Sequence, residues 1–471
     1  MAILACCFYL LLIVLLGYTL LSVIRPSNQL TIVQLTGLCP VVGAGTMGLL
    51  LFWISLMGFA PSRQVLAAIG VVTGAVLVVL KNKQRLPGIK LVANDLDEGD
   101  GWIVIPVGII MAGMAVIVAG AVTSPLTEWD ALAIWAFKAK VLVHAALCPT
   151  PIYFHDTSLS YSHLDYPLMV PFLTAGAYAA MGTVDDQTGK LVSAFLDVLL
   201  VPMVYLGLRW KLRRLPAACL SAMVAVLPMM LRYGGTGYAD LPLAMFYAGS
   251  VFYVSRWIDQ QQWKDLTLAI LFSVFAAFTK NEGLVLSLMN GVVILACGLW
   301  AARRRGWMAA TMFIAAWLAM DAPWLIWSRN LPHTHEDYGS KLLSSQLVTH
   351  LPRLKEIIPA MVVQTAEFQV WGLFWIMVGM LALLGWRALA RPYVLALWIL
   401  LGLHLMSYAL AYSVTPWDIA VLMPMTLDRL FLHAVPAAAF LAGWHWAEAG
   451  VGHQRVGKMK QTSTVKEALD I

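Results

Sequence analysis

The chain has 471 residues, of which 61% are hydrophobic and only 12% are charged. Its apolar runs reach the roughly 20 residues that a helix needs to cross a bilayer core of about 30 Å, so the composition predicts an all-α, polytopic transmembrane helical bundle. The net charge of +6 is scattered between these runs and forms no basic face, so no nucleic acid is expected as a partner. The short alternating segments of a transmembrane β-barrel are not seen.

Cysteine usage favours neither a disulfide framework nor a zinc site. The six cysteines form no CxxC pair, and Cys6, Cys7, Cys219 and Cys297 lie inside apolar runs. The tract HTHED at 333–337 has the composition of a metal site within a polar loop. A divalent metal is therefore kept as an alternative to the prediction that the protein has no cofactor.

Thirteen membrane spans are predicted, beginning with a run that lacks the basic start and the cleavage site of a signal peptide. They cover approximately residues 3–24, 37–60, 64–80, 102–123, 190–208, 216–231, 240–256, 265–279, 283–300, 307–327, 370–386, 392–412 and 430–447. Under the positive-inside rule, the basic clusters 209–214 and 303–305 lie in the cytoplasm and the acidic loops lie outside.

No predicted cytoplasmic loop is long enough for a nucleotide-binding domain, and none carries a glycine-rich phosphate loop. Any activated substrate is therefore expected at the outer face or within the bilayer. A lipid-linked donor satisfies this condition, whereas a soluble nucleotide-linked donor does not.

The most informative stretch is Thr127–Lys140, TEWDALAIWAFKAK, which directly follows a span. As a helix it has an apolar stripe that includes Trp135, with Lys138 and Lys140 opposite, and such a helix lies flat at the membrane interface. It would hold Asp130 at the depth of a lipid phosphate. The alternative is an interfacial anchor whose tryptophans and lysines simply favour headgroups.

The same outer loop, residues 124–189, contains a second semi-apolar segment, Tyr166–Gly182. Pro167 and Pro171 lie near its start and shorten the helix that can follow them. The segment is therefore too short for a span and is predicted as a re-entrant or interfacial helix.

Further ionisable groups lie at the outer ends of spans. Asp240 follows a glycine-rich turn and begins an inward span. Lys280 and Glu282 lie in a short turn between two spans, and Arg429 begins the last span. Loop carboxylates are usually solvated and a terminal arginine can snorkel, but charges this close to the bilayer favour a functional site.

The order of these features resembles the C-type integral-membrane glycosyltransferases (GT-C), in particular the branch of protein O-mannosyltransferases and lipid-A aminoarabinose transferases that use polyprenyl-phosphate sugars. The shared features are an acidic pair after a span, a Tyr-Pro pair heading a short helix, a carboxylate opening an inward span, a TK turn with a following acid, and an LDRL segment. They are Glu128 and Asp130, Tyr166 and Pro167, Asp240, Lys280 and Glu282, and Leu427–Leu430.

The resemblance implies three regions and a location. Residues 1–101 are additional N-terminal transmembrane helices with a cytoplasmic loop, 102–447 are a GT-C-like catalytic module, and 448–471 are a cytoplasmic tail. The protein is expected in the bacterial inner (plasma) membrane, with its active site facing the periplasm or exterior.

The resemblance also implies inverting transfer of a sugar from a polyprenyl-phosphate donor to a glycan, lipid or protein acceptor. Asp130, or alternatively Glu128, would take the proton of the acceptor hydroxyl, and Asp240 would orient a substrate. Cationic side chains would stabilise the leaving lipid phosphate. These cations are Lys280, Arg429 and Arg232, and the other predicted substrate-binding residues are Trp129, Trp135, Lys138, His163, Asp165, Tyr166 and Glu282.

Two other functions are kept as alternatives. A multi-span transporter or lipid flippase would show internal repeats with broken helices, and no convincing repeat is found. A glycan ligase or polymerase with a diphosphate donor would keep the same outer-face site. The glycosyltransferase hypothesis requires Asp130, Asp240, Lys280 and Arg429 to converge beside the lipid headgroups.

Overall fold

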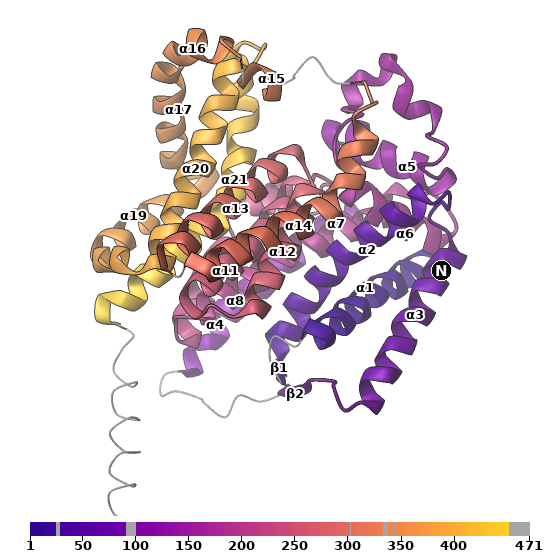
Figure 1. The fold of residues 1–471 in the computed structure, drawn as a ribbon, viewed down its shortest axis with the longest axis horizontal. Helices are drawn as coiled ribbons and strands as arrows, with labels where there is room; N and C mark the ends of the chain where they lie inside the picture. The colour runs from indigo at the N-terminus through magenta and orange to yellow at the C-terminus, as the bar shows by residue number, and fades with distance from the viewer. Residues whose placement is uncertain (25–28, 91–99, 302, 333–337, 343, 452–471) are drawn as a thin grey trace, which may run out of the picture.

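The structure is a computed structural model that describes residues 1–24, 29–90, 100–301, 303–332, 338–342 and 344–451. Its N-terminal helices lie on the right of Figure 1, its C-terminal helices on the left, and α11–α14 between them. The N-terminal elements are α1 (Ala2–Ile24), β1 (Gln29–Thr31), η1 (Gln34–Leu38), α2 (Cys39–Leu56), α3 (Arg63–Asn82) and β2 (Gly88–Lys90). Strands β1 and β2 pair in parallel, with Gln29 opposite Gly88.

Helices α1 and α2 pack with their backbones in direct contact. A Cβ atom added at Gly17 would lie 1.8 Å from the carbonyl oxygen of Cys39, and one added at Gly43 would lie 1.9 Å from that of Ile13. Small residues allow such close approach between membrane helices, where dispersion contacts replace the hydrophobic effect as the source of stability.

The loop 124–189, which is predicted to lie outside, folds into short helices beside α1 and α2. Its elements, with the span before it, are η2 (Asp100–Ile103), α4 (Val104–Thr123), η3 (Ala131–Ala136), α5 (Phe137–His144), η4 (Ile152–His155), η5 (Thr157–Ser162) and α6 (Met169–Met181). Helix α6 is buried along nearly its whole length and packs against α1, α2 and α5. The semi-apolar segment is thus a short internal helix.

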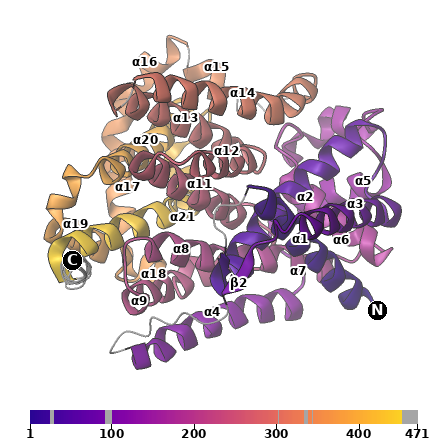
Figure 2. The ribbon, with the colours of Figure 1, turned by 60° about the horizontal axis from the view of Figure 1, so that its bottom comes forward.

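The central helices are α7 (Asp186–Val198), α8 (Leu200–Arg209), α9 (Arg214–Ala225), α10 (Pro228–Tyr233), α11 (Asp240–Gln260), α12 (Trp263–Ala277), α13 (Asn281–Ala301) and α14 (Arg303–Ser328). Helix α11 is the most enclosed of them, because α8, α12, α13, α20 and α21 all pack against it. Figure 2 shows α4 along the lower edge of the molecule, below α9. The first residue of α11 therefore lies where several helices meet.

The C-terminal elements are α15 (Tyr338–Leu342), α16 (Gln346–His350), η6 (Leu351–Arg353), α17 (Leu354–Ala366), α18 (Phe368–Trp371), α19 (Phe374–Leu384), η7 (Trp386–Ala390), α20 (Pro392–Val414), α21 (Ile419–Trp446) and η8 (Ala447–Val451). Helices α20 and α21 pack against each other and against α11.

The predicted helical membrane architecture is confirmed. Eight helical segments in the described ranges are long and apolar enough to cross a membrane. They are Ala2–Ile24, Gln34–Leu56, Arg63–Asn82, Gly101–Thr123, Asp186–Arg209, Arg305–Ser328, Pro392–Val414 and Ile419–Ala449. Four shorter apolar helices accompany them: Met169–Met181, Arg214–Ala225, Asn281–Cys297 and Phe374–Leu384. The count of thirteen spans stays a prediction.

Three predicted spans differ from the observed helices. The segment 216–231 divides into α9 and α10 because Pro228 begins a new helix. The segment 370–386 divides at Gly372, whose φ of +55° is left-handed. The last helix begins at Ile419 instead of residue 430, since the side chain of Asp418 accepts a hydrogen bond from the Ala420 N–H and caps it. Arg429 therefore lies within α21.

The contact between α1 and α2 yields a stability prediction. Replacing Gly17 by Ala forces the two backbones apart, and overpacking of this kind costs about 1–3 kcal/mol. The free energy of unfolding, measured by denaturant titration in detergent micelles, should fall accordingly. The matched control is Gly74→Ala in α3, where an added Cβ meets no atom within 4 Å; this control should be neutral or stabilising. Equal stability of the two variants would contradict the close-packing account.

Candidate functional site

Charged residues from four distant segments meet in one set of ion pairs, here called the charged network. Lys280 Nζ lies 3.0 Å from Asp240 Oδ1 and 2.9 Å from Glu282 Oε1. Arg429 Nη1 lies 2.5 Å from Asp130 Oδ2 and 4.0 Å from Asp240 Oδ2. Asp240 thus joins the two cations, and the structure brings Asp130, Asp240, Lys280 and Arg429 together.

The loop before α11 fixes the position of Asp240. Gly235 and Gly237 have φ values of +73° and +94°, which side chains other than glycine rarely adopt. The N–H of Gly235 donates to Asp197 Oδ2 at 2.8 Å, and Ser193 Oγ donates to the same oxygen at 3.1 Å. Asp197, which is 1% exposed, therefore anchors this loop against α7.

Lys280 lies in the turn between α12 and α13 and is only 7% exposed. Burial disfavours the charged form of an amine, but the carboxylates of Asp240 and Glu282 outweigh burial and raise the pKa of Lys280 above its ordinary value. The ammonium group therefore stays charged at neutral pH.

His433 and Tyr408 extend the charged network, although the sequence analysis did not select them. His433 Nε2 lies 3.1 Å from Asp240 Oδ1, and its Nδ1 lies 2.7 Å from the Tyr408 hydroxyl. His433 is fully buried. It follows Arg429 by four residues, and that spacing places both side chains on one face of α21. This spacing is the signal by which the sequence could have revealed it.

The two acids that follow α4 make different contacts. Asp130 pairs directly with Arg429, whereas Glu128 Oε2 accepts a hydrogen bond from the Tyr238 hydroxyl at 3.3 Å. The guanidinium carbon of Arg429 lies 5.0 Å from the centroid of the Tyr238 ring, a cation–π contact. Tyr238, which the sequence analysis also omitted, thus links both acids to the network.

Arg232 lies at the edge of this site. Its guanidinium carbon is 5.5 Å from the ring centroid of Tyr233, and its charge interacts with the carboxylate of Asp428, the neighbour of Arg429. It is therefore near the charged network, with its charge directed toward Asp428.

The other predicted substrate-binding residues form an aromatic cluster beside the network. The rings of Trp135 and Tyr166 lie 6.0 Å apart, and those of His163 and Tyr166 lie 4.5 Å apart. Trp135 and Tyr166 pack with Ala239, the residue before Asp240. Asp165 is half-buried, whereas Trp129 is 65% exposed and contacts the ring of Tyr161.

Lys138 does not lie on an exposed basic flank, as the helical pattern predicted. It is fully buried, and its Nζ donates to the backbone carbonyl of His163 at 2.5 Å. The physical reason is that Ala131–Ala136 form a π-helix, whose i→i+5 hydrogen bonds rotate the residues that follow relative to a regular α-helix. Burial lowers the pKa of Lys138 to about 7, against an opposing effect of the Asp165 charge.

No group of three or more His, Cys, Asp or Glu side chains that could hold a metal ion occurs within the described ranges. The tract at 333–337 lies outside the described residues. Lys280 and Arg429 are the cationic side chains of the charged network.

Part of the chain matches a known family. Residues 165–327 match the family model described as dolichyl-phosphate-mannose-protein mannosyltransferase. The matched range contains Asp240 and Lys280, whereas Asp130 and Arg429 lie outside it. The predicted resemblance to glycosyltransferases of this kind is therefore confirmed, over less than half of the chain.

Two solved structures are similar to this chain: ArnT from Cupriavidus metallidurans bound to undecaprenyl phosphate, and the same protein in the apo state. Their sequence identities to the chain are 14% and 15%, and both TM-scores are 0.48. The alignments cover 79% of this chain and 64% of ArnT, so the chain spans about 64% of the length of these proteins. No curated protein matches the chain significantly.

The burial of Asp240 yields a stability prediction. Asp240→Asn removes the carboxylate that pairs with buried Lys280 and lies 4.0 Å from Arg429. It should lower the free energy of unfolding by about 3 kcal/mol, the lower end for breaking a buried pair. The control Glu282→Gln removes the other partner of Lys280, but that carboxylate is 22% exposed, so the loss should be smaller. Denaturant titration of the two variants compares them, and equal losses would contradict the central place of Asp240.

Lys138 yields a pH prediction. The folded-state pKa of about 7 lies below the ordinary value of 10.5, so between these values the unfolded chain binds more protons than the folded one. The free energy of unfolding should therefore rise with pH above about 7, by up to ~1.4 kcal/mol per pH unit.

Lys138→Met should remove this rise, which unfolding midpoints between pH 6 and 9 measure. The control is Lys140→Met, because Lys140 pairs with Asp186 at the surface. A rise that persists in Lys138→Met would assign the pH dependence to another group.

Proposed function

We propose that the protein is a membrane glycosyltransferase that moves a sugar from a polyprenyl-phosphate donor to an acceptor hydroxyl, with inversion at the anomeric carbon. The observation that carries this proposal is the charged network, in which Asp130 and Asp240 share Arg429, and Asp240 also pairs with Lys280. The matched family supports the donor class, since its description names a polyprenyl-phosphate sugar. The basic loops on the other side of the spans support an extracytoplasmic site.

Asp130 and Arg429 would perform the chemistry. The acceptor oxygen forms a bond to the anomeric carbon as the bond from that carbon to the phosphate oxygen breaks. The acceptor proton passes to the Asp130 carboxylate, and the electron pair of the broken bond leaves with the lipid phosphate. Arg429 and Lys280 stabilise the charge that this phosphate gains, so the proposal requires no metal ion.

The contact between Asp130 and Arg429 indicates how donor binding makes the Asp130 carboxylate available as a base. Asp130 and Arg429 are 27% and 17% exposed, so a ligand can reach their pair. A donor phosphate that recruits the guanidinium would separate it from Asp130 and free a carboxylate oxygen for the acceptor proton. Donor binding would thereby activate the base, and Glu128, held by Tyr238, is the alternative base.

Asp240 is better suited to positioning than to proton transfer. Its side chain is 2% exposed and contacts Lys280 and His433 directly, with Arg429 at 4.0 Å. A carboxylate enclosed by three nitrogen-bearing groups cannot readily reach an acceptor hydroxyl. We therefore assign it the role of holding the two phosphate-binding cations at a fixed separation.

Loss of the proposed base yields the activity prediction. Asp130→Asn in purified protein, assayed with a polyprenyl-phosphate sugar, should lower the transfer rate by roughly 10²- to 10⁴-fold, the usual contribution of a general base. The matched control Glu128→Gln should retain most of the activity. Thermal unfolding of both variants checks that the fold is intact.

Three outcomes would contradict the proposal. Wild-type activity in Asp130→Asn would remove that residue from the role of base. Transfer from a diphosphate donor but not from a monophosphate donor would assign the protein to the ligases and polymerases. Accumulation of substrate in vesicles without any product would assign it to the transporters.

A further inference from the structure

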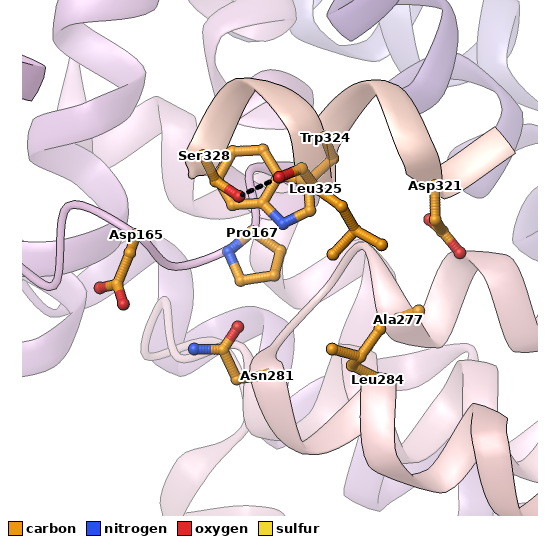
Figure 3. Close-up of a pocket in the computed structure, with 9 residues that line it drawn as sticks. All are labelled: Asp165, Pro167, Ala277, Asn281, Leu284, Asp321, Trp324, Leu325 and Ser328. Carbon is orange, nitrogen blue, oxygen red and sulfur yellow. Dashed lines mark hydrogen bonds between the residues drawn. The ribbon is translucent and has the colours of Figure 1, made fainter. Parts of the chain in front are cut away.

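A cavity of about 150 Å³ lies between α14 and the turn that joins α12 to α13. Figure 3 shows its lining residues in two groups, with those of α14 above and those of α12 and α13 below, and with Pro167 between them. The lining residues that bear on its chemistry are Asn281, Leu284, Asp321, Trp324, Leu325 and Ser328. No member of the charged network lines this cavity.

Asp321 is the least expected residue of this lining. It lies inside α14, within a segment apolar enough to cross the membrane, and is 1% exposed. Neither carboxylate oxygen has a hydrogen-bond partner among the described residues. A buried carboxyl group without partners costs several kcal/mol, so an ionisable side chain in such a place marks a ligand site or pathway.

The rest of the lining combines flat apolar surface with polar groups. Trp324, Leu325 and Leu284 provide apolar walls, and Asn281 and Ser328 add polar atoms. This mixture suits a ring with an apolar face and hydroxyl groups at its edge. The volume is comparable to that of an engineered cavity of roughly 150 Å³ that accommodates benzene, so one six-membered ring is the matching size.

The cavity and the charged network contain residues that are adjacent in the sequence. Asn281, which lines the cavity, follows Lys280, which pairs with Asp240. Consecutive Cα atoms are about 3.8 Å apart, and the sugar of a polyprenyl-phosphate donor is bonded to the phosphate itself. A phosphate held by Lys280 would therefore bring its sugar to the entrance of this cavity.

We propose that this cavity is the subsite for the sugar ring of the donor, with the Asp321 carboxyl accepting hydrogen bonds from the ring hydroxyls. The proposal rests on the proposed function, because that function supplies the donor. It makes Asp321 a specificity-determining residue that acts on the sugar and not on the lipid phosphate.

The test compares two ligands in purified full-length protein: polyprenyl-phosphate mannose and the bare polyprenyl phosphate. Wild type should bind the mannosyl lipid more tightly. Asp321→Val should reduce the ratio of the two affinities by about tenfold, the upper end for losing one hydrogen bond. Its affinity for bare polyprenyl phosphate should be unchanged, and Asp321→Asn, which retains an acceptor oxygen, should reduce the ratio less.

The matched control is Asp265→Asn. Asp265 is also a buried carboxylate, 3% exposed, but it pairs with Arg256 at the opposite end of α12 from the cavity. This variant should leave the affinity ratio unchanged. This control distinguishes the general effect of removing a buried carboxylate from the specific effect of losing a contact to the sugar.

A labelling measurement on wild type covers the case in which the Asp321 variants do not fold. A hydrophobic carbodiimide should modify Asp321, and the mannosyl lipid should slow this modification more than bare polyprenyl phosphate does. An affinity ratio unchanged in Asp321→Val, or equal protection by the two lipids, would overturn the subsite while leaving the proposed function intact. Failure of wild type to bind either lipid would overturn both.

Discussion

The ion pairs of Asp240 are the interaction on which the site depends. Its carboxylate is buried at the start of α11, where Lys280 approaches it from the turn after α12, and His433 and Arg429 approach it from α21. A buried charge is tolerated only when partners compensate the lost hydration. The turn after α12 and the middle of α21 are therefore joined at this point by ion pairs to one shared carboxylate.

This arrangement also explains which parts of the site the sequence reveals. Asp240, Lys280 and Arg429 were identified because charges at the ends of apolar runs are rare and costly. His433 and Tyr408 complete the same network but lie within apolar helices, where a single polar residue is usually a packing group. Their role depends on which helices are neighbours, and a pattern along one helix carries no information about its neighbours.

Local departures from regular geometry limited the prediction in other places. The assignment of Lys138 to an exposed flank assumed 3.6 residues per turn, and the π-helix at Ala131–Ala136 breaks that period. The last helix was predicted to begin at residue 430, yet it begins at Ile419 and contains Pro424 and Pro436. In both cases hydropathy was enough to predict the fold class. It did not predict the direction in which a side chain points, because that direction depends on backbone hydrogen bonding.

Asp197 and Asp321 are both carboxylates buried within apolar helices, and the same cost of desolvation has different consequences at the two positions. Asp197 accepts hydrogen bonds from Gly235 N–H and Ser193 Oγ, so its burial is compensated inside the fold and its role is to anchor a loop. Asp321 is equally buried and lines a cavity, but its oxygens lack such partners among the described residues. The cost of desolvation is similar for the two carboxylates, but the hydrogen-bond donors that compensate it differ. For Asp197 a backbone N–H is the donor, and this bond fixes a loop. For Asp321 the cavity leaves room for a ligand to be the donor.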